Sequence, residues 1–168
     1  MLKSIVILFL ITMIPGLELR ASIPMGIFGG ESIAVILPWP VTVLVCILAN
    51  IVIGWTVFFL LDPLVSICRH FPWFEKWIMR YLERGQRKLK PEIEKYGTFG
   101  LAVFIGIPLP LTGAYTGAAG AYALGMKKRK FMIANVIGVL IAATCVTAVC
   151  LLIRAGINLP IFDWLIKH

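Results

Sequence analysis

The sequence predicts an all-α membrane protein that crosses the bilayer more than once and consists of two related halves in opposite orientation. Three observations lead to this prediction: long uncharged apolar blocks, breaks rich in glycine and proline, and phrases that recur in both halves. The chain has 168 residues, of which 60% are hydrophobic and 14% are charged. A soluble domain has about 25% charged residues, so this chain lacks the polar surface of a soluble globular protein.

The apolar residues occur in three blocks without any charged side chain, at residues 32–61, 96–126 and 131–153. Crossing the hydrocarbon takes about 20 apolar residues, so each block is long enough. Sixteen Lys and Arg against eight Asp and Glu give a net charge of +8, and most of the cations flank these blocks, within residues 69–95 or 127–130. This placement indicates cytoplasmic anchoring to anionic lipid headgroups and excludes a nucleic-acid-binding protein.

The N-terminal region predicts a first membrane-dipping hairpin. The apolar run from Ser4 to Gly16 is too short to cross the bilayer comfortably. It breaks at Pro15-Gly16, and we expect a turn through residues 17–24 before the chain resumes as helix at residues 25–30. A transmembrane helix follows this hairpin.

The segment between the two halves predicts an amphipathic helix in the membrane interface. Residues 71–82 carry aromatic and aliphatic side chains at roughly helical spacing, and charged residues lie between them. Trp73 and Trp77 are expected at the level of the lipid headgroups, where indole rings are enriched.

The second half predicts a hairpin that enters the membrane from the cytoplasm. Residues 107–113 contain Pro108 and Pro110 and cannot form a continuous helix, because each proline removes a backbone donor and clashes with the preceding turn. If residues 96–126 crossed once, the two basic clusters would lie on opposite faces, whereas a hairpin places both in the cytoplasm. Broken backbone at membrane depth must line protein or water, so the break should border a cavity.

The two halves share short phrases in the same order. Ala49-Asn-Ile-Val-Ile-Gly54 resembles Ala134-Asn-Val-Ile-Gly138, and Ile14-Pro15 resembles Ile107-Pro108. Because one spanning helix separates the hairpins, the second hairpin enters from the opposite face, which makes an inverted repeat. The predicted parts are a first repeat at 1–61 (hairpin about 4–31, transmembrane helix about 41–61), a cytoplasmic amphipathic linker at 62–95, a second repeat at 96–154 (hairpin about 97–125, transmembrane helix about 131–153) and an interfacial segment at 155–168.

Two charged residues at the first break are the main candidates for function. Glu18 and Arg20 are the only charges that this arrangement forces to membrane depth, where ionisable groups are costly and usually functional. Glu18 is a candidate carrier of a coupling proton, and Arg20 is a candidate ligand of an anionic phosphate or carboxylate. The alternatives are a mutual salt bridge that only pins the hairpin tip, or a tip shallow enough to be wet.

Neutral groups near the breaks complete the candidate substrate or ion site. Asparagines on the spanning helices either bond the unpaired carbonyls of the breaks or line the path. Hydroxyl groups follow the second break, and prolines border both breaks. The Lys/Arg run after the second hairpin is expected at the membrane surface. The candidate site residues beside Glu18 and Arg20 are Pro24, Asn50, Pro108, Pro110, Thr112, Tyr115, Thr116 and Asn135, and the surface residues are Trp73, Trp77, Lys127, Lys128, Arg129 and Lys130.

Cofactor-dependent and enzymatic functions find no support in the sequence. The four cysteines include no CxxC pair, and no His/Cys/Asp cluster has the spacing of metal ligands, so we expect neither a metal nor another cofactor. The motifs of intramembrane aspartyl proteases, HExxH metalloproteases and phosphate-cradling loops are absent, as is a Ser/His/Asp set. We therefore expect a protein that is not an enzyme.

Two phrases resemble those of the small multidrug export family, namely Pro15-Gly-Leu-Glu-Leu-Arg-Ala-Ser-Ile-Pro24 and Gly106-Ile-Pro-Leu-Pro-Leu-Thr-Gly-Ala-Tyr-Thr-Gly117. That family is similar in plan to the DedA (VTT-domain) superfamily, whose members have opposed re-entrant hairpins. Several of those members are implicated in proton-coupled flipping of polyprenyl phosphate or phospholipids. The resemblance implies that Glu18 is the acidic hairpin residue. The DedA pattern also has an arginine in the second hairpin, which this sequence lacks, and Arg20 in the first hairpin is the candidate replacement.

The sequence thus predicts a multi-pass plasma-membrane protein with cytoplasmic basic loops and both termini outside. The expected function is a proton- or ion-coupled secondary transporter or lipid flippase, with a midplane site between the hairpin tips. Its expected substrate is a small amphipathic molecule or a lipid phosphate, its surroundings are anionic headgroups, and a homodimer is expected. The alternative is a non-transporting scaffold that organises lipid or a partner protein.

Overall fold

The chain folds into α-helices throughout the part that the computed structural model describes, which comprises residues 2–29, 37–68, 72–107 and 112–156. Within these residues there is no strand. This agrees with the predicted all-α fold class. The helices are α1 (Leu2–Thr12), α2 (Glu18–Phe28), α3 (Trp39–Cys68), α4 (Pro72–Tyr96), α5 (Thr98–Gly106), α6 (Ala114–Ala123) and α7 (Lys128–Arg154).

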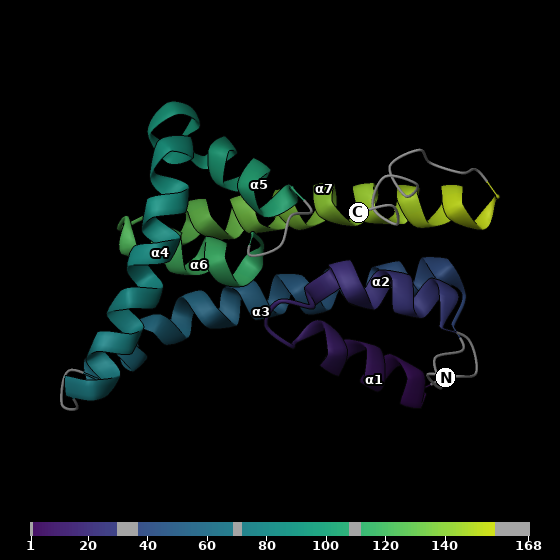
Figure 1. Ribbon diagram of the computed structural model, residues 1–168, viewed down its shortest axis with the longest axis horizontal. Helices are drawn as coiled ribbons and strands as arrows, with labels where there is room; N and C mark the ends of the chain where they lie inside the picture. Colours follow the sequence, from purple (N-terminus) through teal and green to yellow (C-terminus); the bar gives the residue numbers. More distant parts are fainter. Residues whose placement is uncertain (1, 30–36, 69–71, 108–111, 157–168) are drawn as a thin grey trace, which may run out of the picture.

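Helices α3 and α7 are the two candidate membrane spans. The apolar stretches Trp39–Val65 and Lys128–Arg154 each have 27 residues, which at 1.5 Å per residue reach about 40 Å and exceed the roughly 30 Å hydrocarbon core. Only 28% of the most apolar part of α3 and 33% of that of α7 are buried inside the molecule. Their outward faces carry large apolar side chains, as expected of a membrane protein and not of a soluble one. The two helices contact each other and run in opposite directions (Figure 1).

The first hairpin consists of α1 and α2, which contact each other and α3. The chain turns between them with positive φ angles of 91° at Gly16 and 45° at Glu18. The expected turn through residues 17–24 is wrong, because α2 already begins at Glu18 and contains Pro24. The helix continues past this proline because its buried face packs tightly, with Ile23 fully buried and Gly26 directly against the Thr42 side chain of α3. That packing offsets the one backbone hydrogen bond that a proline removes.

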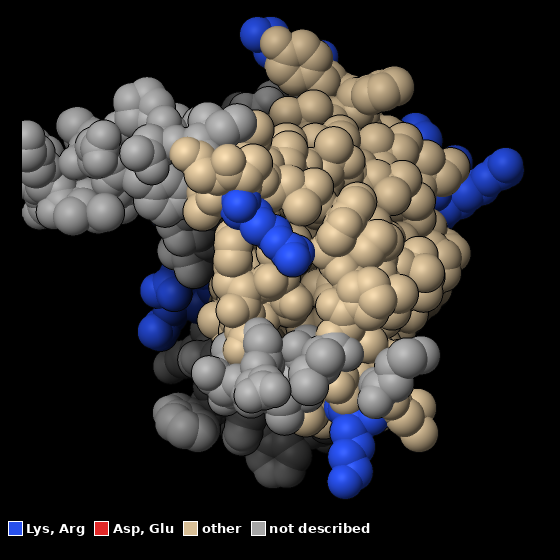
Figure 2. All heavy atoms as spheres, turned by 90° about the vertical axis from the view of Figure 1, so that its right-hand side faces the viewer, with Lys and Arg blue, Asp and Glu red and all other residues tan. Residues whose placement is uncertain are grey.

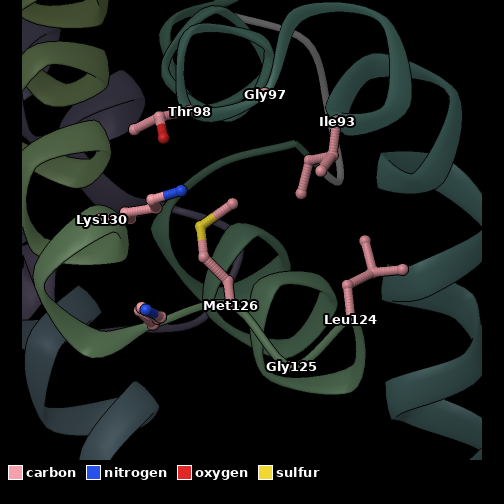
Figure 3. A pocket seen from close by; sticks show the side chains of 8 residues that line it. Ile93, Gly97, Thr98, Leu124, Gly125, Met126 and Lys130 are labelled. Atoms are coloured by element: carbon pink, nitrogen blue, oxygen red, sulfur yellow. The ribbon is translucent and has the colours of Figure 1, made fainter.

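The second hairpin consists of α5 and α6, the two short helices on either side of the predicted break. Helix α5 ends at Gly106 and α6 begins at Ala114, whereas Pro108 and Pro110 lie outside the described residues. The outer ends of both helices border one cavity of about 310 Å³, which is lined from the α5 side by Gly97 and Thr98 and from the α7 side by Lys127 and Lys130 (Figure 3). The chain therefore enters and leaves this segment at the same end of the molecule.

Helix α4 runs across the spans at the end of the molecule where α7 begins (Figure 1). Its apolar stripe packs against α6, with Ile78 and Leu82 in a buried cluster together with Ala119. The backbones come closest at Gly85 and Gly120, because a Cβ at Gly85 would lie 2.8 Å from the Gly120 amide nitrogen. The charged side chains of α4 that are described, Arg80, Glu83, Arg84, Arg87, Lys90 and Lys95, are exposed. The helix is therefore amphipathic, as its sequence predicts.

The first span is longer than expected. Helix α3 continues through Asp62 and Pro63 to Cys68, past the predicted end at about residue 61. The extension persists because Leu61 is buried against α4 and Val65 packs on the same cluster. Trp73 and Trp77 lie in α4, and their side chains are outside the described part. The predicted interfacial segment at 155–168 lies almost wholly outside the described residues.

The described charges gather at the α4 end. Lys128, in the first turn of α7, lies 3.5 Å from the Asp62 carboxylate near the end of α3, and its ammonium group lies over the Phe59 ring. At the opposite end, the surface that Figure 2 shows is mostly uncharged, with a few Lys and Arg side chains and no Asp or Glu in view. The fold therefore places the basic run 127–130 and the amphipathic helix α4 together at one end of the molecule.

Candidate functional site

The carboxylate of Glu18 joins the tip of the first hairpin to the start of α6. It is 5% exposed, at the first residue of α2. Its Oε2 accepts a hydrogen bond from the Ala114 amide at 3.4 Å, and its Oε1 accepts one from the Tyr115 amide at 3.4 Å. The first amides of a helix have no acceptor within the helix and favour a negative charge. Glu18 thus acts as the N-terminal cap of a helix that lies 96 residues further along the chain.

Gly113 makes this approach sterically possible. Its φ of 142° lies in a region that residues with a side chain rarely adopt. A Cβ at this position would overlap the Glu18 carboxylate, since it would lie 2.8 Å from Oε1 and closer still to Oε2. Only glycine therefore lets the carboxylate reach the amides of α6.

Asn50 of the first span also contacts the Glu18 carboxylate. Its side chain lies close enough to that group to favour the charged carboxylate, and the residue is 1% exposed. The Asn50 Oδ1 is buried and has no hydrogen-bond partner in the described structure. This contact is with a carboxylate and not with an unpaired carbonyl of a break, the structural role that the sequence suggested for Asn50, and a role in lining the path stays a prediction.

Arg20 binds residues on both sides of the second break. Its Nη2 donates to the carbonyl oxygen of Ile107 at 2.8 Å and to the hydroxyl of Thr112 at 2.9 Å, and its Nη1 donates to the carbonyl of Thr112. Ile107 directly follows α5. The last carbonyls of a helix have no amide donor within the helix. A cation is favourable at this end of a helix. Glu18 thus binds the start of α6, whereas Arg20 binds the end of α5 at Ile107 and also Thr112, two residues before α6.

Tyr115 returns a contact from the second hairpin to the first. Its hydroxyl donates to the carbonyl of Met13, the residue that follows α1. Its own carbonyl accepts a hydrogen bond of 3.2 Å from the Tyr81 hydroxyl of α4. Burial, together with the nearby Glu18 and Tyr115, raises the pKa of Tyr81 to about 12, so this hydroxyl remains a donor. Sequence reasoning missed Tyr81, because a tyrosine on an amphipathic helix is typical of an interfacial anchor.

The other predicted site residues that the structure describes, Asn135, Thr116 and Pro24, make no hydrogen bond to Glu18 or Arg20. Asn135 of α7 donates to the Ile51 carbonyl of α3 at 3.2 Å, and Gly54 leaves room for its side chain, so it links the two spans. Thr116 is half-buried on α6, and Pro24 is half-buried inside α2. Pro108 and Pro110 fall outside the residues that the structure describes.

A buried polar cluster beneath Glu18 was not expected. The hydroxyls of Thr12 and Ser22 lie 2.8 Å apart, and Ser22 donates to the Glu18 carbonyl at 2.8 Å. The Cys46 thiol of α3 is in hydrogen-bonding contact with both hydroxyls. The signal that could have found this cluster is the presence of two small hydroxyl residues, Thr12 and Ser22, on either side of the Pro15-Gly16 break. The cluster fixes α1, α2 and α3 together just behind the carboxylate.

The site offers hydrogen-bonding and charged groups but no metal-ligand set. Among the residues that the structure describes, no three His, Cys, Asp or Glu side chains lie close enough to hold a metal ion. The arrangement can hold an anion near Arg20 and the α6 amides, and it can bind or release a proton at the Glu18 carboxylate.

A family model described as "Putative small multi-drug export protein" matches residues 18–145 of the chain. The match begins at Glu18 and contains both charged residues, the second break and both candidate spans up to Cys145. Comparisons with curated proteins and with solved structures find no match. The chain belongs to the small multi-drug export protein family, and it is a membrane protein.

Proposed function

We propose that this member of the small multi-drug export family is a secondary transporter whose path opens and closes between the tips of its two helical hairpins. The observation that carries the proposal is the pair of buried charges from the first hairpin that bind the second hairpin's broken backbone. A transported substrate is amphipathic and carries an anionic group. Amphipathic anions that are exported and lipid phosphates that are flipped share this chemistry, so an exporter and a lipid flippase are two versions of one proposal.

The membrane arrangement we propose has two re-entrant hairpins related as an inverted repeat. In support, α3 and α7 run in opposite directions, and the two hairpins extend from opposite ends of the molecule to meet at their tips (Figure 1). The α4 end, with its basic residues, faces the cytoplasm of the plasma membrane by the positive-inside tendency. Helix α4 then lies along the cytoplasmic surface, and the charged pair lies near the bilayer midplane, as in other inverted-repeat transporters.

The proposed coupling acts through the acceptor strength of Glu18. An ionised carboxylate accepts strong hydrogen bonds from the Ala114 and Tyr115 amides, whereas a protonated one accepts weaker bonds. Protonation therefore weakens the contact between the hairpin tips. An anionic group of a substrate can then occupy the place beside Arg20 and the α6 amides that the carboxylate leaves. Release of the proton on the other side restores the closed contact, which couples substrate movement to the proton gradient.

The experiment compares Glu18→Gln and Arg20→Gln with two matched controls in proteoliposomes under a pH gradient. The controls are Glu83→Gln and Arg80→Gln, which make the same chemical changes at exposed positions of α4. The probes are a cationic amphipathic dye, an anionic amphipathic dye and a fluorescent phosphatidylglycerol. We expect the wild-type protein and both controls to move at least one of the two anionic probes, and Glu18→Gln to lower that rate at least tenfold, or about 1.4 kcal/mol of barrier.

One observation favours the second candidate function, a non-transporting scaffold. Arg20 binds two backbone carbonyls and one hydroxyl at the second break, which is also what a purely structural clamp requires. A scaffold predicts that no probe moves and that Glu18→Gln changes assembly or melting temperature only. Gradient-dependent transport that persists unchanged in a correctly inserted Glu18→Gln protein would rule out the coupling role of this carboxylate.

A further inference from the structure

The cavity at the base of the second hairpin is a candidate ligand site distinct from the hairpin tips. Its volume of about 310 Å³ lies in the range of roughly 300–1,000 Å³ that is typical of small-ligand sites. It is lined by Ile93, Gly97, Thr98, Leu124, Gly125, Met126, Lys127 and Lys130. It lies at the α4 end, where the basic run begins (Figure 1).

The polar part of the lining suits an anion with several acceptor oxygens. Lys127 and Lys130 are three residues apart and therefore share one face at the start of α7. Figure 3 shows the Lys130 side chain reaching into the space between Thr98 and Met126. Neither lysine has a carboxylate within ion-pair distance among the described side chains, in contrast to Lys128, which pairs with Asp62. Two ammonium groups that have no carboxylate partner among the described side chains therefore line the cavity together with one hydroxyl.

The start of α7 adds to this positive potential. The helix begins at Lys128, and the preceding Lys127 provides no side-chain cap for its first amides. The uncapped amides and the helix dipole favour an anion at this position. Lysine binds phosphate as a point charge, whereas planar carboxylates are matched by the fork of arginine. The donor set here therefore fits a phosphate better than a carboxylate.

The apolar part of the lining points to a lipid as the source of that phosphate. Ile93, Leu124 and Met126 line the same cavity. A free inorganic anion gains nothing from such a surface, whereas the glycerol backbone and first methylenes of a phospholipid do. We propose that this cavity binds the phosphate headgroup of an anionic lipid, held by Lys127, Lys130 and Thr98 above an apolar floor.

Such a ligand would contact both junctions that connect the second hairpin to its neighbouring helices. Gly97, with a φ of 59°, joins α4 to α5, and Gly125, with a φ of 65°, joins α6 to α7. Both glycines line the cavity. A bound lipid therefore contacts both junctions and favours the hairpin position that the structure shows.

The test uses two double variants of the same basic run. Lys127→Gln with Lys130→Gln removes the two cations that line the cavity. Lys128→Gln with Arg129→Gln makes the same charge change at the two positions between them, which do not line it. The full-length protein in detergent micelles is mixed with phosphatidic acid or phosphatidylcholine, and retained lipids are counted by native mass spectrometry.

We expect the wild-type protein to retain phosphatidic acid at least about tenfold more strongly than phosphatidylcholine. The cavity variant should lose this preference, and the control variant should keep it. Equal losses in both variants would show diffuse attraction to the whole basic run and would overturn the proposal. Unchanged retention in the cavity variant would overturn it as well.

Two further arms keep the outcome decisive. Competition by millimolar inorganic phosphate would identify free phosphate as the source of the bound group, and its failure to compete would identify the lipid. If the cavity variant does not fold, Met126→Trp fills the apolar floor while all four cations remain. That variant should also lose retention of phosphatidic acid, and normal retention would contradict the proposed site. None of these readouts depends on transport, so they succeed or fail separately from the proposed function.

Discussion

Gly113→Ala tests the contact between Glu18 and α6 most directly. The new methyl group would overlap the Glu18 carboxylate, which has to move away from the amides of Ala114 and Tyr115. The φ of 142° adds backbone strain, which costs about 1–3 kcal/mol. Loss of two hydrogen bonds to a charged group costs about 3 kcal/mol in total, at the lower end of the usual range because both are long.

The expected destabilisation is therefore about 4–6 kcal/mol. For a chain of this size, such a loss lowers the melting temperature by about 8–24 °C if soluble domains are a guide. The assay is thermal unfolding of the purified protein in detergent micelles, followed by circular dichroism. Gly16→Ala is the matched control, since Gly16 has a φ of 91° and nothing within 4 Å of the added Cβ. It should show the strain alone, about 1–3 kcal/mol.

A double-mutant cycle separates steric overlap from strain. In a Glu18→Ala background the overlap disappears, so Gly113→Ala should then cost no more than Gly16→Ala. The coupling between the two sites should be about 3 kcal/mol. If Gly113→Ala and Gly16→Ala have equal effects in both backgrounds, the carboxylate does not occupy the position described, and the account of the site fails.

Three further predictions concern the other contacts between the hairpins and the direction of the chain. Arg20→Lys should lower the free energy of unfolding by about 1.5–3 kcal/mol in a denaturant titration. The reason is that one ammonium group cannot reach the Ile107 carbonyl and both Thr112 acceptors as the guanidinium does. An effect equal to that of Arg80→Lys, at an exposed position, would contradict this. Tyr115→Phe should cost about 1 kcal/mol in the same titration through loss of the bond to the Met13 carbonyl, and a neutral result would place that hydroxyl elsewhere. In a chain whose native cysteines are replaced by alanine, Lys95→Cys and Lys127→Cys should react with a membrane-impermeant maleimide from the same side, and Arg154→Cys from the other; labelling of positions 95 and 127 from opposite sides would refute the re-entrant second hairpin.

The sequence predicted the elements whose length or composition leaves few alternatives. An uncharged block such as residues 131–153 forms a long helix, and prolines at 108 and 110 do not permit one helix from 96 to 126. The cost of charges at membrane depth was enough to select Glu18 and Arg20. Each of these inferences depends on a local property of the chain.

The misjudged features depend on contacts between distant residues. Local rules make Pro24 a helix breaker, yet the packing of Ile23 and Gly26 keeps α2 continuous. The sequence alone also left a Glu18–Arg20 salt bridge as a natural alternative, because the two residues are only two positions apart. In the structure both groups bind the second hairpin, Glu18 at the first amides of α6 and Arg20 at Ile107 and Thr112, and no local pattern encodes partners that lie more than 80 residues away.

The contacts at the tips are reciprocal, and this constrains how the protein can work. Each break exposes peptide groups that its own helices leave unpaired, and the other hairpin supplies their partners. Arg20 donates to the Ile107 carbonyl, and Tyr115 donates to the Met13 carbonyl. Glu18 accepts from the first amides of α6. In the proposed membrane arrangement the tips lie at bilayer depth, where an unpaired polar group costs several kcal/mol, so the tips cannot part into empty hydrocarbon. They can part only when water or a substrate group replaces each lost partner. A transport cycle built on these hairpins therefore requires water or the substrate to take over these hydrogen bonds as the tips open, so the groups that close the path also select what can enter it.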